Sequence, residues 1–297
     1  MLRIARHLTP YEGCDNLTPE DMADIYDYFI RGNIDKDAVF TQTKKLDSSF
    51  EFNGLRFRVN ISLSGDVPVF TLRLIKNELP TFDELGVPNI VRRMMYQPQG
   101  LVLVTGKTNS GKTTTLNALI NEINETQNKK ILTLESPVEF KHKCKQSVIV
   151  QKEVGYGQDV LTYKDGVKNC LREDCDILVI GEIRDRETAE IAMQAGQTGH
   201  YVLSTIHTID SIEVITRLRK IGVSDYDIAS TLATSLSQRL VRKICPNCRK
   251  ERPFNDQEKK IITSIGEKYG IKYDLDNAVT YDAVGCAKCN HSGYAGR

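Results

Sequence analysis

The chain lacks an excess of charge of either sign. It has 40 Lys and Arg residues against 39 Asp and Glu, which leaves a formal net charge of +1 over 297 residues. A chain with so little net charge has no overall field that attracts nucleic acid or an acidic membrane. Nor does it contain basic residues interleaved with aromatic ones, a pattern of many nucleic-acid-binding surfaces. The basic cluster at residues 239–250 is more typical of a solvated face than of a binding site.

Long hydrophobic runs are also missing. No apolar stretch approaches the roughly 20 residues that a membrane-spanning helix needs. Residues 1–7 (MLRIARH) are too short and too polar for a signal peptide, so we expect the protein in the cytosol. The sequence shows no internal repeat and no low-complexity tract. Its length suits roughly two domains with cores of their own.

The first 75 residues predict a small α+β domain. Residues 18–21 (TPED) form a helix start, with a cap followed by proline and acids in the first turn. Asn53-Gly54 lies between two alternating apolar segments, which indicates a hairpin, and residues 67–75 indicate a further strand. A domain with a single hairpin has little sheet to bury, and residues 293–297 provide no closing element. We therefore expect a fragment of a longer protein.

Residues 91–240 predict an α/β domain. The preceding segment, residues 76–90, contains prolines and a glycine and resembles a linker. Short apolar strands then alternate with helical segments, which is the pattern of a parallel sheet flanked by helices. The predicted strands are residues 101–105, 131–134, 177–181 and 201–205. After residue 240 the sequence changes character, and residues 241–297 form a separate region with two cysteine pairs.

Residues 106–113 (GKTNSGKT) carry the strongest functional signal. They fit G-x-x-x-x-G-K-[ST] and stand between an apolar strand and a helical segment, the context that a phosphate-binding loop requires. Backbone N–H groups of such a loop face phosphate oxygens, and the helix N-terminus adds partial positive charge. Lys112 would neutralise the β- and γ-phosphates, and the Thr113 hydroxyl would ligate Mg²⁺. The predicted nucleotide-binding residues are Gly106, Thr108, Asn109, Ser110, Gly111, Lys112, Thr113 and Thr114. We predict that the chain binds a nucleoside triphosphate.

Acidic and imidazole side chains follow the predicted strands and are candidates for the chemistry. Glu182 ends a buried strand, where an acid can face Mg²⁺ or the attacking water, although strand-end acids often only cap helices. Glu135 and Glu139 follow another strand, and either could polarise a water molecule. His207 stands just past residues 201–205, where it could sense the γ-phosphate, although a single histidine there is more often structural.

Cys245/Cys248 and Cys286/Cys289 form two C-x-x-C pairs. Each pair offers two thiolates to one ion, and two pairs complete the tetrahedral S₄ shell that Zn²⁺ favours. Because this shell leaves no open position, the zinc would be structural. The spacer exceeds that of common zinc ribbons, so we expect residues 251–285 to form a small excursion. The alternative is four free buried thiols.

Together these segments resemble the secretion ATPase superfamily, in particular the motors of type II secretion and type IV pilus assembly. The matching pieces are the Walker A loop, an "Asp box" at 132–140, a Walker B segment at 174–185 and a "His box" at 199–208. The run IGEIRDRETA at 180–189 is highly specific to this family. The resemblance covers about residues 15–297. It implies an α/β fold, with a RecA-like P-loop NTPase core, a small N-terminal α+β (PAS-like) domain and a C-terminal zinc-binding subdomain.

The resemblance also implies roles for individual residues. The implied catalytic residues are Glu139, Glu182, His207, Arg58 and Arg73. Glu139 would be the general base, Glu182 the Walker B acid near Mg²⁺, and His207 a group near the γ-phosphate, with His200 in the same box. Arg58 and Arg73, with Arg56 possible, would reach the phosphates of a neighbouring subunit, since guanidinium forks suit the spread charge of a transferring phosphoryl group. Without the family they would be ordinary exposed strand residues.

The sequence departs from the family pattern at three positions. Ser136 stands where the Asp box usually has Asp beside the proline, and Cys175 stands where proline usually separates two aspartates. Gly181 takes the place of the acid that precedes Glu182 in many P-loop enzymes, although glycine fits this family. Loss of the acid at 136 could weaken the positioning of Mg²⁺ or water, so we expect a slow activity.

The resemblance further implies a homo-hexameric ATPase at the cytoplasmic face of the inner membrane. Its cofactors would be ATP, Mg²⁺ and Zn²⁺, and its partner an inner-membrane platform protein, with no direct contact to nucleic acid. The tetracysteine motif favours the assembly or export branch over retraction motors. Pilus assembly, protein secretion and DNA uptake all stay open.

Two other functions stay open as well. One is a RecA-like nucleic-acid translocase or DNA-uptake motor with a zinc ribbon, against which the neutral charge counts. The other is a structural subunit that does not hydrolyse ATP, which the serine at position 136 makes conceivable. Salt-titrated DNA binding would separate the first from the motor, and phosphate release the second.

Overall fold

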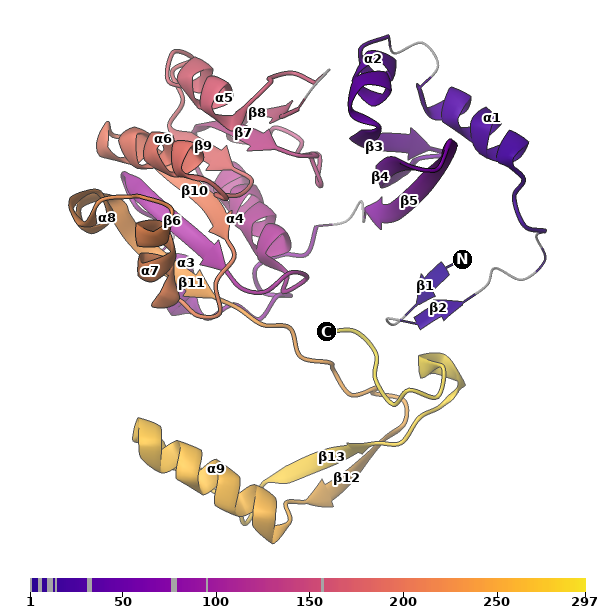
Figure 1. The fold of residues 1–297 in the computed structure, drawn as a ribbon. Coiled ribbons are helices and arrows are strands. Elements are labelled where there is room, and N and C mark those ends of the chain that lie inside the picture. Colours follow the sequence, from indigo (N-terminus) through magenta and orange to yellow (C-terminus); the bar gives the residue numbers. More distant parts are fainter. Residues whose placement is uncertain are drawn as a thin grey trace. The chain divides into compact units, whose positions relative to one another are not determined.

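The computed structural model describes residues 2–4, 7–9, 13, 15–30, 34–75, 79–94, 96–155 and 158–297. The chain divides into two compact units, Met1–Gln238 and Arg239–Arg297 (Figure 1). Residues 76–78 of the predicted linker lie outside the described part. Within that part, no helix is long and apolar enough to cross a membrane.

The first unit begins with two small antiparallel sheets and two helices. The elements are β1 (Leu2–Ile4), β2 (His7–Thr9), α1 (Pro19–Ile30), α2 (Ile34–Thr43), β3 (Lys45–Phe52), β4 (Leu55–Ser64) and β5 (Val67–Ile75). Helix α1 starts where the sequence predicts because Thr18 and Asp21 cap it: the Asp21 N–H donates to Thr18 Oγ1, and the Thr18 N–H donates to Asp21 Oδ2. The predicted hairpin is confirmed, with Asn53 and Gly54 at φ 49° and 72° in its turn.

One face of the β3-β4-β5 sheet is apolar and the other carries arginines. Leu46, Val59 and Ile61 belong to a buried cluster that also includes residues of α1 and α2. Successive residues of a strand face opposite sides of the sheet. Arg56 and Arg58 therefore lie on the face opposite the cluster, together with residues of β5 that pair with them.

The rest of the first unit is built on a six-stranded parallel sheet of order β11-β6-β10-β9-β7-β8. The strands are β6 (Gly100–Thr105), β7 (Lys130–Glu135), β8 (Val148–Glu153), β9 (Ile177–Ile180), β10 (Tyr201–Ile206) and β11 (Leu232–Ser237). The sequence predicts the four central strands, which are almost fully buried. It does not predict β8 and β11, whose residues are mostly half-buried because both strands lie at the sheet edges.

Helices cover both faces of this sheet. They are α3 (Asn89–Met94), α4 (Lys112–Thr126), α5 (Tyr163–Cys170), α6 (Arg186–Gln197), α7 (Glu213–Lys220) and α8 (Asp225–Thr231). Leu119 of α4 packs in one cluster with Val102 and Val104 of β6, whereas α5, α6, α7 and α8 pack in another with Leu101 and Leu103. Phe82, from the predicted linker, is 3% exposed and belongs to the cluster of α4.

The second unit has its own small framework. Strands β12 (Arg249–Pro253) and β13 (Val279–Ala283) pair antiparallel, and helix α9 (Asp256–Tyr269) lies between them in sequence. A capping box of Asn255 and Glu258 starts α9. The guanidinium of Arg252 binds both Glu258 and Asp282, which ties the helix to the hairpin. The spacer between the cysteine pairs thus forms the separate excursion that the sequence predicts.

Candidate functional site

The predicted phosphate-binding loop connects β6 to α4. Its backbone conformation requires glycine: a Cβ on Gly106, at φ 148°, would lie 2.5 Å from both Gln238 O and Ser110 Oγ. Gly111 has φ 87° and precedes the first residue of α4. The Ser110 hydroxyl is buried and has no hydrogen-bond partner among the described residues. A tight loop with an unpartnered hydroxyl, opening a helix, fits a phosphate ligand.

Lys112 occupies the centre of this loop and is 7% exposed. Its ammonium donates to the carbonyl oxygens of Gly106 (3.1 Å) and Lys107 (3.2 Å), and it lies 3.5 Å from Nδ1 of His207. Burial lowers the pKa of Lys112, while the carboxylate of Glu182 opposes this effect. The side chain that would meet the β- and γ-phosphates is thus held inside the loop by the loop's own carbonyls.

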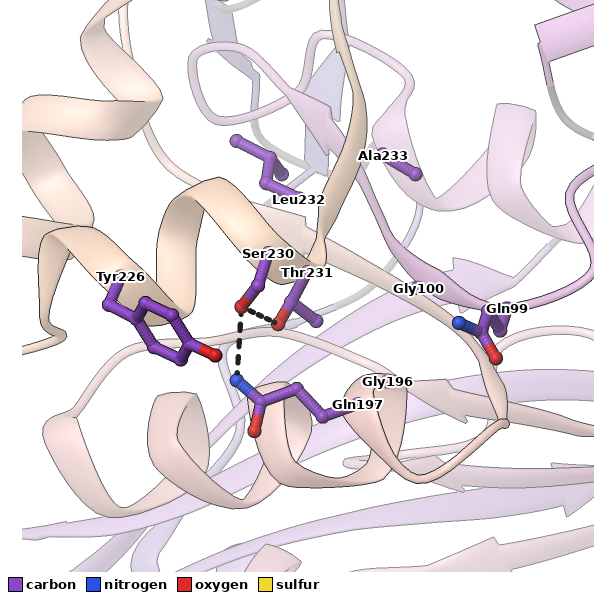
Figure 2. A pocket seen from close by; sticks show the side chains of 9 residues that line it. All are labelled: Gln99, Gly100, Gly196, Gln197, Tyr226, Ser230, Thr231, Leu232 and Ala233. Carbon is purple, nitrogen blue, oxygen red and sulfur yellow. Dashed lines mark hydrogen bonds between the residues drawn. The ribbon is translucent and has the colours of Figure 1, made fainter.

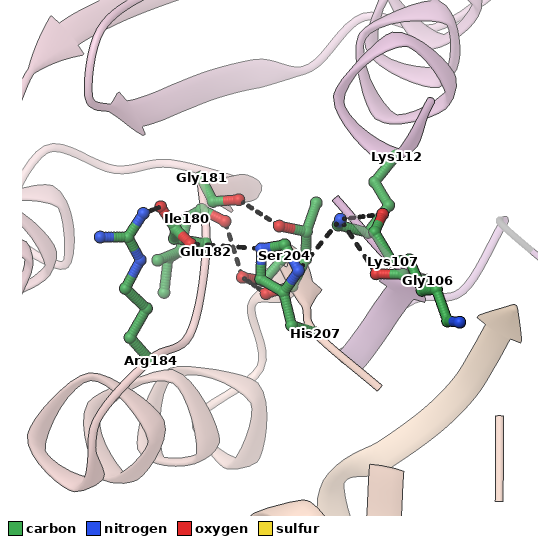
Figure 3. A network of polar contacts seen from close by, with 10 residues as sticks. Gly106, Lys107, Lys112, Ile180, Gly181, Glu182, Arg184, Ser204 and His207 are labelled. Carbon is green, nitrogen blue, oxygen red and sulfur yellow. Dashed lines mark hydrogen bonds and ion pairs between the residues drawn. The ribbon is translucent and has the colours of Figure 1, made fainter. Parts of the chain in front are cut away.

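Glu182 and His207 continue this polar network (Figure 3). The loops after β6 and β10 leave the sheet side by side, since Thr105 pairs with Ile206. His207 Nε2 is 3.8 Å from Glu182 Oε2, and the other oxygen of Glu182 forms an ion pair with Arg184. Burial and the charge of Lys112 lower the pKa of His207, so its ring is neutral near pH 7. The structure therefore brings Lys112, His207 and Glu182 together.

The two acids after β7 have different environments. Glu135 is 6% exposed and accepts hydrogen bonds from Thr133 Oγ1 (2.8 Å) and Gln151 Nε2 (3.2 Å). Glu139 is only half-buried. Burial raises the pKa of both carboxyls. For Glu139, the charges of Arg58 and Arg73 lower the pKa but do not cancel the effect of burial. Of the two acids, Glu139 is the one that solvent and substrate can reach.

The three arginines of the N-terminal sheet divide into two kinds. Arg56 is 8% exposed, and its guanidinium donates to the carbonyl oxygens of Val138 (2.8 Å) and Glu139 (3.1 Å). It therefore supports the loop that carries Glu139. Arg58 and Arg73 face each other directly across β4 and β5, and their charges lower the pKa of Glu139 within the same chain. Their expected reach into a neighbouring subunit stays a prediction.

His200 lies at the other end of the sheet from the phosphate loop. It precedes β10, whereas His207 follows this strand, so a span of roughly 20 Å separates them. Its Nδ1 is near the carbonyl oxygen of Ala195 (3.3 Å). A cavity of about 420 Å³ also lies at this end, beside Gly100 at the start of β6. In it, Gln197 Nε2 donates to Ser230 Oγ (3.3 Å; Figure 2). Neither feature belongs to the nucleotide site.

Three residues that the sequence analysis does not assign lie at the site. Gln238 Nε2 donates to the carbonyl oxygen of Ser110 (2.7 Å), and the Gln238 N–H donates to Thr105 O (3.0 Å), which fixes the loop from behind. Arg184 pairs with Glu182. The hydroxyl of Tyr163 lies beside Gly181. Of these three residues, only Arg184 is close in sequence to a predicted site residue, Glu182. Sequence spacing could therefore have indicated Arg184, but not Gln238 or Tyr163.

The four predicted cysteines converge in the second unit. Their sulfur atoms all lie within 4.8 Å of one another, and Cys289 Sγ is 3.8 Å from the sulfurs of both Cys248 and Cys286. Tetrahedral ligands about 2.3 Å from one zinc ion lie about 3.8 Å apart. Backbone N–H groups of Cys286 and Gly293 help lower the pKa of Cys289 to about 6, which favours a thiolate ligand. The donor set and its spacing fit Zn²⁺.

Comparison with known proteins gives one consistent family. A sequence profile described as type II/IV secretion system protein matches residues 42–297. The type II secretion system protein E of Aeromonas hydrophila is 43% identical over 209 residues, which cover 70% of this chain and 39% of that protein. The type IV pilus assembly ATPase PilB of Thermus thermophilus is 35% identical over 248 residues, 82% of this chain and 26% of that protein. The chain thus spans less than half the length of these curated relatives.

Solved structures agree with the sequence comparison. The crystal structure of the pilus retraction motor PilT with bound ADP matches with a TM-score of 0.73 and 30% identity, over 89% of this chain and 82% of that chain. The ATPase DotB of Legionella pneumophila matches with a TM-score of 0.66 and 27% identity, over 90% and 78% of the two chains. These likenesses confirm the predicted α/β class with its parallel-sheet core.

Proposed function

The chain belongs to the family of type II/IV secretion system proteins, and on this premise we propose that it is the motor part of a hexameric ATPase that couples ATP hydrolysis to type IV pilus assembly or type II protein secretion. The observation that carries the proposal is the polar network of Lys112, His207 and Glu182 around a phosphate-binding loop. Relatives named as type II secretion and pilus ATPases support the same reading.

In the proposed reaction, the chain's own groups bind and orient ATP. Lys112 exchanges its bonds to loop carbonyls for bonds to the β- and γ-phosphates, and the N-terminus of α4 adds backbone donors. Thr113 and Glu182 are the groups that would hold Mg²⁺, which would neutralise phosphate charge. His207, neutral and close to Lys112, would contact the γ-phosphate as a hydrogen-bond donor.

Glu139 is the group that we propose removes a proton from the attacking water. Its raised pKa brings the carboxyl closer to the range in which a general base works. The Arg58–Arg73 pair would stabilise charge on the transferring phosphoryl group. If the pair acts on its own chain's nucleotide, a mixture of an Arg58→Ala/Arg73→Ala variant with a Glu139→Gln variant stays inactive. If it acts on a neighbour, the mixture regains turnover.

The zinc site would be structural, because four thiolates leave no position for substrate. It would hold the two ends of the second unit together, where Cys245 and Cys286 begin the two knuckles. The proposed partner is an inner-membrane platform protein, and the proposed location is the cytoplasmic face of that membrane. Work would pass to this partner when ATP turnover changes the relation of the domains in a ring.

The decisive experiment compares phosphate release by the parent chain and a Glu182→Gln variant, in the presence of ATP and Mg²⁺. Glu182→Gln keeps the shape of the side chain and removes its charge, so we expect release to fall at least about 100-fold. Equal, background-level rates would instead support a structural subunit. Sizing with and without ATP and Mg²⁺ tests the hexamer. Micromolar DNA binding that weakens steeply between about 50 and 200 mM salt would favour the translocase.

A further inference from the structure

Tyr163 has a half-buried ring that packs against the core and a hydroxyl that lies near the site. It is the first residue of α5, and Thr162 caps this helix by accepting from the Asp165 N–H (3.1 Å). The ring packs against the large hydrophobic cluster beneath the parallel sheet. Both contacts fix the direction of the side chain, so the place of the hydroxyl is set by the fold.

The hydroxyl lies where β7 and β9 end. A Cβ built on Gly181 would be 3.2 Å from Tyr163 Oη, 3.3 Å from Leu134 O and 3.5 Å from the Cα of Glu135. The Leu134 carbonyl already accepts from the Gly181 N–H (2.8 Å). The hydroxyl thus lies between two strand ends. The end of β7 leads to Glu135 and Glu139, and the end of β9 leads to Glu182.

Charges from both halves of the site act on this hydroxyl. Burial raises the pKa of Tyr163, the carboxylates of Glu182 and Glu135 raise it further, and Arg184 and Arg58 oppose them. The hydroxyl is therefore protonated at neutral pH and can both donate and accept a hydrogen bond. No described residue forms a hydrogen bond with it in this structure. An O–H group so placed is available to a ligand or a water molecule.

We propose that Tyr163 is a positioning residue that orients the attacking water of the hydrolysis site. A water that attacks phosphorus must present a lone pair to it, which leaves two protons to be held. Glu139 takes one of them as the base. Tyr163 Oη accepts a hydrogen bond from the other, while its own proton points to the Glu182 carboxylate. The water oxygen bonds to the γ-phosphorus as the bond from this phosphorus to the bridging oxygen breaks, and ADP leaves with the electron pair of that bond. Tyr163 keeps its proton throughout, and the proton released by the water ends on Glu139.

This inference rests on the proposed ATPase function and deepens it. In a purely structural role, Tyr163 would only fill space beside Gly181, and losing its oxygen would change stability without changing turnover. In the proposed role, the oxygen matters to the chemical step and little to ATP binding, because the water is not part of the nucleotide. The two roles therefore separate in kcat and KM.

The test is Tyr163→Phe, with Tyr201→Phe as the matched control. Tyr201 is more deeply buried than Tyr163, at 4% exposure, and it lies at the start of β10, the far end of the sheet. We expect Tyr163→Phe to lower kcat about 10- to 100-fold, with KM for ATP and affinity for a fluorescent ATP analogue within twofold of the parent. Tyr201→Phe should keep the parental kcat. Equal kcat in Tyr163→Phe and the parent overturns the proposal, and so does a parallel loss of affinity.

A second variant covers the case in which Tyr163→Phe is unstable. In Tyr163→Phe/Gly181→Ala, the added Cβ occupies the space beside the missing hydroxyl, and Gly181 does not have the positive φ that would strain alanine. A filling role predicts that any turnover lost through unfolding returns together with the melting temperature. The proposed role predicts that kcat stays low even where the melting temperature recovers. A parent that releases no more phosphate than Glu182→Gln contradicts the ATPase function itself, a result distinct from either outcome above.

Discussion

Replacing Lys112 by alanine tests the centre of the site. In the structure its buried ammonium donates to the carbonyls of Gly106 and Lys107. When ATP binds, the Lys112 ammonium exchanges its hydrogen bonds to carbonyl oxygens for bonds to phosphate. Only the difference in free energy between these two sets of bonds contributes to affinity. Lys112→Ala removes this difference and leaves the backbone donors of the loop in place. We therefore expect weaker binding of ATP by a folded chain.

The magnitude follows from the distances and the burial. A unit charge pair about 3 Å apart gains about 5 kcal/mol at an effective dielectric constant of about 20. The two hydrogen bonds from a charged donor that are given up are worth about 1.5 kcal/mol each at the low end of their range, about 3 kcal/mol together. About 2 kcal/mol remains, which corresponds to about a 30-fold rise in Kd.

A titration with a fluorescent ATP analogue and Mg²⁺, at constant salt, measures this change. Lys107→Ala is the matched control, since Lys107 belongs to the same loop but its side chain is exposed and only its carbonyl contacts Lys112. We expect a Kd within threefold of the parent for Lys107→Ala. A Lys112→Ala variant that binds within threefold of the parent, or a Lys107→Ala variant that is equally impaired, would refute the reasoning.

Three further predictions concern the metal, the pH and the acid loop. Metal analysis should find about one zinc per chain, lost in Cys245→Ser/Cys248→Ser; a parent without zinc contradicts the site. Burial holds the pKa of His142 at about 4, below its ordinary 6.5, so the unfolded chain binds this proton first. Stability present above about pH 6.5 should therefore be lost as the pH falls toward 4, by up to about 3 kcal/mol in urea unfolding, and His142→Gln should flatten this dependence. Arg56→Ala should slow phosphate release about 10-fold or more, because two carbonyls beside Glu139 lose a charged donor; parental rates would show that the loop does not need this support.

The sequence was sufficient for the elements whose signals are local. The phosphate loop needs glycine at fixed spacing because neighbouring atoms leave no room for a Cβ at Gly106. This requirement appears directly in the sequence as the spacing of the glycines. The central strands are mostly apolar because both faces of the sheet are covered. The edge strands β8 and β11 were missed because they lack that continuous pattern.

Contacts between distant segments could not be read from the sequence. Gln238 meets Ser110 only because β11 pairs with β6, and a strand order is not encoded in any one segment. The support of the Glu139 loop by Arg56 depends on how the N-terminal sheet meets the loop after β7. Likewise, nothing in the spacing distinguishes His200 from His207; the strand between them decides which one lies at the loop.

The face-to-face arrangement of Arg58 and Arg73 has a consequence for the N-terminal sheet. Two like charges on directly paired residues repel each other and weaken the pairing of β4 with β5. A bound anion between them would remove this repulsion, so amide hydrogens of the two strands should exchange more slowly once nucleotide is present. The small sheet would then respond to the nucleotide that the phosphate loop holds, and the pairing of β4 with β5 would strengthen and weaken with each cycle of turnover.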